Sequence, residues 1–428
     1  MDINEKKNAL IEKLNAPTPP ERLAALSELK AMIDAGEITM TPRGTDINNH
    51  IHTIYSFSPY SPCKAVWLSC VAGLCTAGLM DHDSISGAKE FIKAGEIMGL
   101  PTTVGMEMRV SFRGTPLEDR RINNPDQSGV AYMALHGVPH DAIDRVNEFM
   151  APYREERNKR NRAMTARINE ITAPMGITLD FDRDVLSLSR AEEGGSVTER
   201  HVLFGLAQAI IRKYGRGPAV LGFVRDKLGM SVSPRLEARL NDPENSHYDY
   251  DLLGILKSDT RFFYIDADAE CMPVKAALEF ADAIGAISAY AYLGDVAQSV
   301  TGDKRAQSFE DSYLDELFSI ISELGFRAVT YMPSRNTEEQ LERLRTLCER
   351  YALFQISGED INSPRQLFIC EALKNPKYSN LVDSAWALIG HENAATGDHS
   401  RGMFSKETLC DMPELDNRIS HYSKLGKQ

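Results

Sequence analysis

Short apolar segments that end in polar residues recur along this chain, and they alternate with segments of helical periodicity. The apolar pattern first appears at 46–52 and returns at 79–83 and 101–107, with helix-like segments at 62–73 and 88–98 between. A strand, a helix and a second strand, with polar residues where each strand ends, are typical of a parallel sheet or barrel. The pattern therefore predicts an α/β fold.

The same pattern predicts how the 428 residues are divided. Strand periodicity fades near Glu118 and resumes with a helix and strand that begin at Ala276, and most of the intervening sequence is charged and helical. Pattern alone places element boundaries only to within several residues. The predicted parts are a helical N-terminal lead-in (1–44), the first part of the barrel (45–144), a mainly helical insertion (145–255), the second part of the barrel (256–365) and a C-terminal helix and tail (366–428).

Composition excludes several classes of protein. The 48 basic and 61 acidic side chains give a net charge of −13, which repels polyanions and argues against general nucleic-acid binding. No apolar run approaches the eighteen residues of a membrane span, so no membrane partner is predicted. The first residues lack the apolar core of a signal peptide, and the seven cysteines form no Cys-x-x-Cys pair. We therefore expect a cytoplasmic protein with free thiols.

Two histidines stand at the first predicted strand end, in His50-Ile51-His52. Side chains two residues apart share one face of a strand, so both imidazoles could bind one metal ion. The pair alone is weak support for a metal site, because two histidines can also occupy an exposed strand end.

The next two strand ends add carboxylates to this pattern. Asp81-His82-Asp83 follows an apolar strand directly, and Glu107 ends the segment that follows. Charged groups are costly in a protein core without partners, which favours a site over a core position. Two alternatives remain: Asp83 could cap the next helix, and Glu107 could pair with Arg109.

Together, His50-Ile51-His52-Thr53, Asp81-His82-Asp83 and Gly105-Met106-Glu107 resemble, in order and spacing, the polymerase and histidinol phosphatase (PHP) family of phosphoesterases. The resemblance covers about 45–365, and the segments 157–171 and 198–202 look like the helical insertion of the nucleotide-hydrolysing branch. It implies an irregular, TIM-like PHP-type barrel of seven βα units, with up to three metal ions at the carboxyl ends of the strands.

The sequence departs from the family pattern at several ligand positions. The family places Asp after the serine of the first motif, where this chain has Phe57. A family histidine falls at Tyr132, with His136 as a possible substitute. The Ala-His-Pro element looks like Ala289-Tyr290-Ala291, and the closing Asp-x-His looks like Asp360-Ile361-Asn362.

These departures spare one metal site of the family. The resemblance implies at least one divalent ion, and mixed imidazole and carboxylate ligands suit Zn, Mn or Fe. A second or third ion would require His136, Tyr290 or His201 as a ligand. The implied ligands of the first ion are His50, His52, Glu107 and Asp360, and the residues that could support or extend this set are Asp81, Asp83, His136 and Asn362.

The resemblance implies a metal-dependent hydrolase, a phosphoesterase that acts on a small phosphorylated metabolite or nucleotide through a metal-activated water. The alternatives are a degenerate, non-catalytic PHP barrel that binds a ligand or partner, and a hydrolase whose substrate lacks phosphate. The roles that follow are general acid for His82 or His201, hydrogen-bond donor to phosphate for Tyr290, and substrate binding for Arg109, Arg200 and Arg335, each arginine having an ordinary surface or ion-pair alternative.

Overall fold

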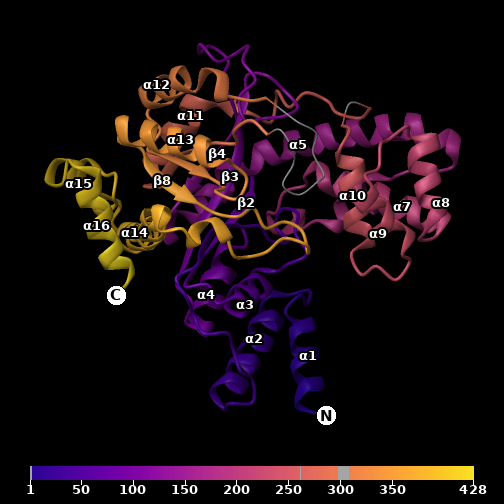
Figure 1. Cartoon of the computed structure of the whole chain (residues 1–428), viewed down its shortest axis with the longest axis horizontal. Coiled ribbons are helices and arrows are strands. Elements are labelled where there is room, and N and C mark those ends of the chain that lie inside the picture. Colours follow the sequence, from indigo (N-terminus) through magenta and orange to yellow (C-terminus); the bar gives the residue numbers. More distant parts are fainter. Residues whose placement is uncertain (1, 261, 297–307) are drawn as a thin grey trace.

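A sheet that curls into a nearly closed barrel forms the centre of the molecule (Figure 1). The computed structural model describes residues 2–260, 262–296 and 308–428. The strands follow the order β1-β2-β3-β4-β6-β7-β8, and the short β5 pairs with β3. They are β1 (Ile47–Ile51), β2 (Thr76–His82), β3 (Thr102–Ser111), β4 (Val130–His136), β5 (Met272–Pro273), β6 (Ile287–Ala291), β7 (Ala328–Tyr331) and β8 (Phe354–Ser357).

Two backbone hydrogen bonds close the barrel between β1 and the segment after β8. The His52 amide donates to the Ile361 carbonyl at 3.0 Å, and the Ile361 amide donates to the His50 carbonyl at 3.1 Å. The predicted α/β barrel is thus confirmed. One strand differs from the predicted rhythm, because β4 runs antiparallel to both of its neighbours, β3 and β6.

Side chains alternate between the two faces of the barrel wall, as they must along a strand. The inward positions below the mouth carry Met80, Ala134, Ala289 and Phe354, which pack together in one buried cluster. Their neighbours in sequence face outward into the main core beneath the helices. The inward positions nearer the carboxyl ends of the strands are polar, which places any site there.

Helices cover the outside of the barrel. The N-terminal pair packs on this layer, and Arg22 of that pair forms a buried ion pair with Glu90 at 2.6 Å. The helices of the lead-in are α1 (Ile3–Lys13) and α2 (Pro19–Asp34), and those of the layer are α3 (Pro62–Ala72), α4 (Ala88–Met98), α11 (Val274–Ala283), α12 (Leu314–Leu324) and α13 (Glu338–Arg350).

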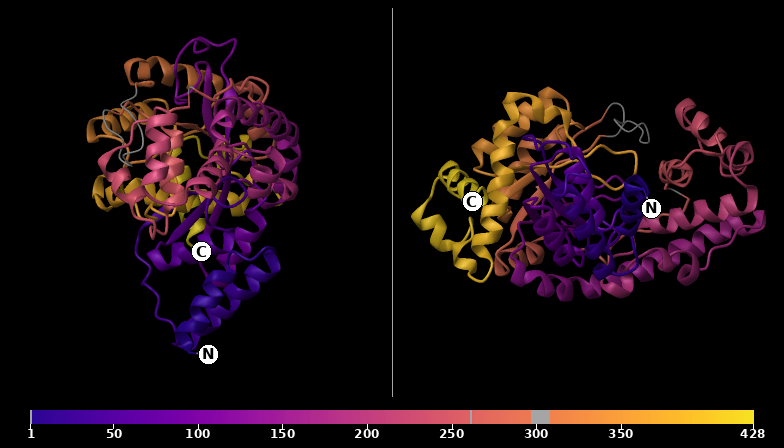
Figure 2. Two further views of the ribbon diagram at one scale, coloured as in Figure 1. Left: turned by 90° about the vertical axis from the view of Figure 1, so that its right-hand side faces the viewer. Right: turned by 90° about the horizontal axis from the view of Figure 1, so that it is seen from below.

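A helical part with its own hydrophobic core lies to one side of the barrel (Figure 2). The long helix α5 leads into it from the barrel. The boundaries 145 and 255 stay a prediction, and the helices of this region run from Ile143 to Lys257. They are α5 (Ile143–Thr172), α6 (Phe181–Asp184), α7 (Glu199–Tyr214), α8 (Pro218–Gly222), α9 (Pro234–Asn241) and α10 (Tyr248–Lys257).

The C-terminal helices α14 (Ser379–Ala395), α15 (Lys406–Asp411) and α16 (Leu415–Gly426) cover the amino end of the barrel. The carboxylate of Glu392 accepts hydrogen bonds from Thr103 Oγ1 at 2.7 Å and from the Val104 amide at 2.8 Å, both at the start of β3. It also lies 2.8 Å from Nε2 of His140. No helix among the described residues is long and apolar enough to cross a membrane.

Candidate metal centre

Three imidazoles and two carboxylates meet at the mouth of the barrel, where β1, β2 and β8 end and where Glu107 of β3 lies beside His82, the last residue of β2. Nε2 of His52 lies 3.0 Å from an oxygen of Asp360, and Nδ1 of His82 lies 3.0 Å from an oxygen of Glu107. Nε2 of His50 lies 3.8 Å from the same Glu107 oxygen. The predicted ligands His50, His52, Glu107 and Asp360 are therefore brought together, and His82 joins them.

These five residues form two overlapping groups of possible ligands. The ligand atoms of His50, His52 and Asp360 all lie within 4.8 Å of one another, and so do those of His52, His82 and Glu107. His52 belongs to both groups, so one imidazole links the two halves of the cluster.

A hydrogen-bond relay fixes which nitrogen of His52 faces the cluster. The hydroxyl of Ser56 donates to Asp81 Oδ1 at 2.6 Å, so its oxygen is left to accept from Nδ1 of His52, 3.3 Å away. The Thr53 amide and hydroxyl also donate to Asp81. With its proton on Nδ1, His52 presents the lone pair of Nε2 to the site, as metal-binding histidines do.

The cluster keeps its carboxylates ionised. Burial alone would raise the pKa of Glu107, but the imidazoles of His82, His50 and His52 outweigh it and lower that pKa to about 2. Burial likewise opposes ionisation of Asp360, yet His52 holds its pKa well below the usual range. Two carboxylates that stay charged at neutral pH suit a cation.

The pKa values of His50 and His52 are shifted in opposite directions. Burial lowers the pKa of His50, which outweighs the effect of Glu107 and favours the neutral ring that a metal requires. Burial also acts on His52, but Asp360 outweighs it and raises the His52 pKa. A proton on His52 is thus the group that a metal ion would have to displace.

The donor atoms fit a divalent ion. Nε2 of His50 is buried and has no hydrogen-bond partner among the described residues, a costly state unless another group binds it. Imidazole nitrogens and carboxylate oxygens together suit Mn, Fe or Zn. The side chains of Asp360 and His82 are 34% and 23% exposed, so solvent reaches the cluster.

Three of the residues predicted to support the ligands, Asp81, Asn362 and Asp83, make different contacts. Asp81 acts through Ser56 and Thr53, and the Asn362 amide donates to Asp360 Oδ1. Asp83 forms an ion pair with Arg157 instead of capping the following helix, whose N-cap is Gly87.

His136 faces the inside of the barrel. It lies two residues after Ala134, which pairs with Glu107, and so occupies the next inward position deeper in the barrel. Its Nε2 is buried and has no hydrogen-bond partner among the described residues, and burial lowers its pKa to about 3. It belongs to neither group of possible ligands in the described parts of the chain.

The prediction that Tyr290 contacts the substrate requires correction. Its inward neighbour Ala289 lines the barrel, whereas Tyr290 faces outward, where its ring packs edge-on against Phe326 with centroids 6.2 Å apart. Its hydroxyl donates to Glu310 at 3.3 Å. Tyr132 does face inward, with its ring 6.0 Å from that of His82.

His201 is held within the insertion. Its Nδ1 accepts a hydrogen bond from the Thr198 amide at 3.0 Å, and its ring lies edge-on to Phe57 at 5.0 Å. Burial lowers its pKa to about 3, so the ring is neutral at pH 7. This placement argues against the predicted role as general acid. Phe57 itself belongs to the buried core of the insertion.

The three predicted arginines differ in their surroundings. Arg109 is buried and pairs with Glu199 and Glu270, not with Glu107, which argues against a substrate contact. Nε of Arg335 donates to a backbone carbonyl after β6 at 3.1 Å. Arg200 is close enough to Asp360 to help lower the pKa of that carboxyl.

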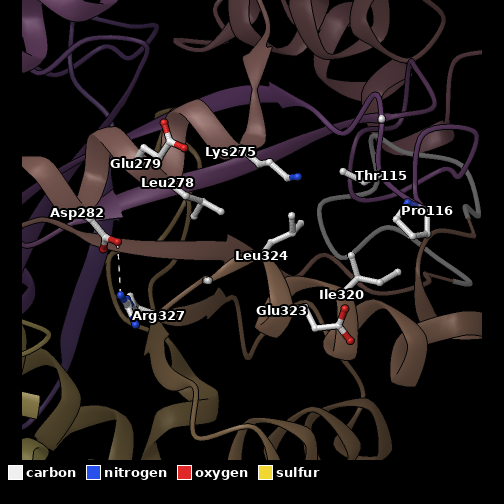
Figure 3. A pocket seen from close by; sticks show the side chains of 12 residues that line it. Thr115, Pro116, Lys275, Leu278, Glu279, Asp282, Ile320, Glu323, Leu324 and Arg327 are labelled. Atoms are coloured by element: carbon white, nitrogen blue, oxygen red, sulfur yellow. Dashed lines mark hydrogen bonds and ion pairs between the residues drawn. The ribbon is translucent and has the colours of Figure 1, made fainter.

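The cluster is separate from a pocket on the outer surface of the barrel. That pocket, of about 440 Å³, lies on the outside of the barrel between α11 and α12 (Figure 3). Leu278 and Leu324 point into it, and Asp282 and Arg327 form an ion pair at its edge. None of the predicted site residues lines it.

Comparisons with known proteins give only distant structural likenesses. No family model matches the chain, and no curated protein sequence matches it. A protein from Bifidobacterium adolescentis, provisionally described as a metal-dependent phosphoesterase, is similar at 19% identity and a TM-score of 0.49, over 78% of this chain and 96% of its own. An amidohydrolase from Chromobacterium violaceum with bound sulfate and no metal is similar at 16% identity and a TM-score of 0.49, over 76% and 90%. At these values neither likeness assigns an activity to this chain.

Proposed function

We propose that the chain is a metal-dependent hydrolase with a single divalent ion at the mouth of the barrel. The observation that carries this proposal is the convergence of five ligand-type side chains from four strand ends. Because the relay through Ser56 leaves only Nε2 of His52 free, and both groups of possible ligands need this residue, the cluster serves one ion. The candidate ligands are His50, His52, His82, Glu107 and Asp360, in two groups of three that share His52.

A bound ion would supply a water of lowered pKa and neutralise charge on the substrate. The chain's own residues hold this site in place. Asp81 and Ser56 fix the orientation of His52, and Asn362 fixes that of Asp360. Arg200 contributes positive charge that helps to lower the pKa of Asp360, and we propose it as the residue that attracts an anionic substrate. His82, which the sequence predicted as a general acid, is a metal ligand in this proposal.

The proposed substrate class rests on the resemblance of the motifs to the PHP phosphoesterases. That resemblance implies a small phosphorylated metabolite or nucleotide, hydrolysed as a phosphate ester. A barrel that binds a ligand without turnover is the second candidate, because Tyr290 faces away from the barrel interior, His201 is packed against Phe57, and Phe57 stands where the resembled family has a ligand.

Release of phosphate from a panel of small esters tests this proposal. We expect chelator-treated protein to be inactive, and one equivalent of Mn²⁺, Fe²⁺ or Zn²⁺ to restore turnover of at least one nucleotide or sugar phosphate. Tight binding of an ion without turnover of any phosphate ester, carboxylic ester or amide would favour the non-catalytic barrel. Turnover of amides alone would indicate a substrate without phosphate.

A further inference from the structure

We propose that Arg157 of the insertion is a positioning residue for the metal centre, because it holds Asp83 in the conformation that aims His82 at the ion. The inference rests on the proposed function, in which His82 is a ligand. It assigns to the insertion a role in assembling a site whose ligands all come from the barrel.

The backbone of Asp83 has an unusual conformation. Its φ is +48°, in the left-handed region that residues other than glycine adopt less readily. Its amide donates to the Glu107 carbonyl at 2.8 Å, which extends the pairing of β2 and β3 past His82. Asp83 therefore fixes the strand end from which His82 projects.

Two arginines of α5 hold Asp83 in this conformation. Arg157 forms an ion pair with its carboxylate, and Nη1 of Arg154 donates to its carbonyl at 3.0 Å. Residues three apart lie on the same side of a helix, so both arginines reach the same strand end. Asp83 and Arg157 are 7% and 4% exposed, so water cannot replace these contacts.

A buried ionic network fixes Arg157 in turn. Its Nε donates to Glu270 at 3.0 Å, and the same carboxylate pairs with Arg109 and with Arg160 at 2.6 Å. Glu199 pairs with the latter two arginines. Three guanidinium groups thus face three carboxylates, those of Asp83, Glu199 and Glu270, and loss of one partner leaves a buried charge uncompensated.

The test measures the affinity for Mn²⁺ alone, by competition with a chromophoric chelator, and needs no substrate. We expect Arg157→Gln to weaken binding about tenfold or more, as loss of groups that orient metal ligands does. Arg162→Gln is the matched control, because Arg162 lies on the same helix and pairs with the exposed Asp182. It should bind as the wild type does. If Arg157→Gln does not fold, Arg157→Lys takes its place. Lysine keeps the positive charge but cannot contact both Asp83 and Glu270, so it should weaken Mn²⁺ binding less than glutamine does.

A rescue separates positioning from simple loss of stability. Glycine adopts positive φ without strain, so Asp83→Gly combined with Arg157→Gln should recover most of the lost affinity. Asp83→Ala with Arg157→Gln restores the same charge balance and should not recover it. Equal affinity in the Arg157 variants and the Arg162 control, or equal recovery by alanine and glycine, would overturn the inference. Wild-type protein that binds no ion would contradict the proposed function itself.

Discussion

Replacing His50 with alanine is expected to lower the affinity for a divalent ion more than about 100-fold, since losing groups that merely orient metal ligands already costs 10–100-fold. Nε2 of His50 is buried without a hydrogen-bond partner among the described residues, which is why we propose it as a metal ligand. Turnover of any phosphate ester should fall in parallel. Isothermal titration calorimetry with Mn²⁺ or Zn²⁺ measures the first effect, and phosphate release measures the second.

Two variants make this experiment specific. His421→Ala removes an exposed imidazole on α16, far from the cluster, and should bind the ion as the wild type does. Glu107→Gln keeps the shape of a ligand and removes its charge, so it should also bind weakly. If His50→Ala kept the wild-type affinity and activity, the site would lie elsewhere.

Replacing Phe57 with alanine is expected to destabilise the protein by about 3–5 kcal/mol, the usual cost of removing a buried phenylalanine ring. Phe57 is 7% exposed and extends from the loop after β1 into the core of the insertion. There its ring contacts those of His201, Phe204 and Tyr250, with centroids 5.0 to 6.0 Å apart. Urea unfolding followed by circular dichroism measures the loss.

Substitutions at Phe57 also test whether an aspartate at this position could bind a further metal ion. Phe57→Leu keeps an apolar side chain and should lose less stability than Phe57→Ala. Phe57→Asp provides the residue type that the family uses as a ligand, but the side chain would be buried among aromatic rings. We expect it to destabilise the chain more than alanine does and to bind no additional ion. An extra bound ion in Phe57→Asp would contradict this assignment of the position.

Local patterns indicated four of the five residues of the cluster, those at the ends of β1 and β2 and in β3. His50, His52, His82 and Glu107 each stand where a short apolar segment ends, and parallel strands bring such ends together. The alternation of faces then places all four inside the barrel. The strand-end pattern indicated that these residues lie near one another, and the family resemblance supplied the expectation that they bind a metal.

Features that depend on strand register or on distant partners could not be predicted in this way. A shift of one residue exchanges the two faces of a strand, and Tyr290 faces outward although Ala289 beside it faces the barrel interior. β4 is antiparallel to β3 and follows it without an intervening helix, so the alternation of strand and helix did not reveal it. Arg109 and Glu270 are 161 residues apart, and no local pattern indicates their ion pair.

The number of metal ions that the purified chain binds tests the central claim most directly. Elemental analysis of protein stripped with chelator, reloaded with Mn²⁺, Fe²⁺ or Zn²⁺ and desalted gives this number without any substrate. The single relay-fixed nitrogen of His52, shared by both groups of possible ligands, predicts one tightly bound ion per chain. Retention of no ion, or of two or more, would contradict the proposed single-metal centre.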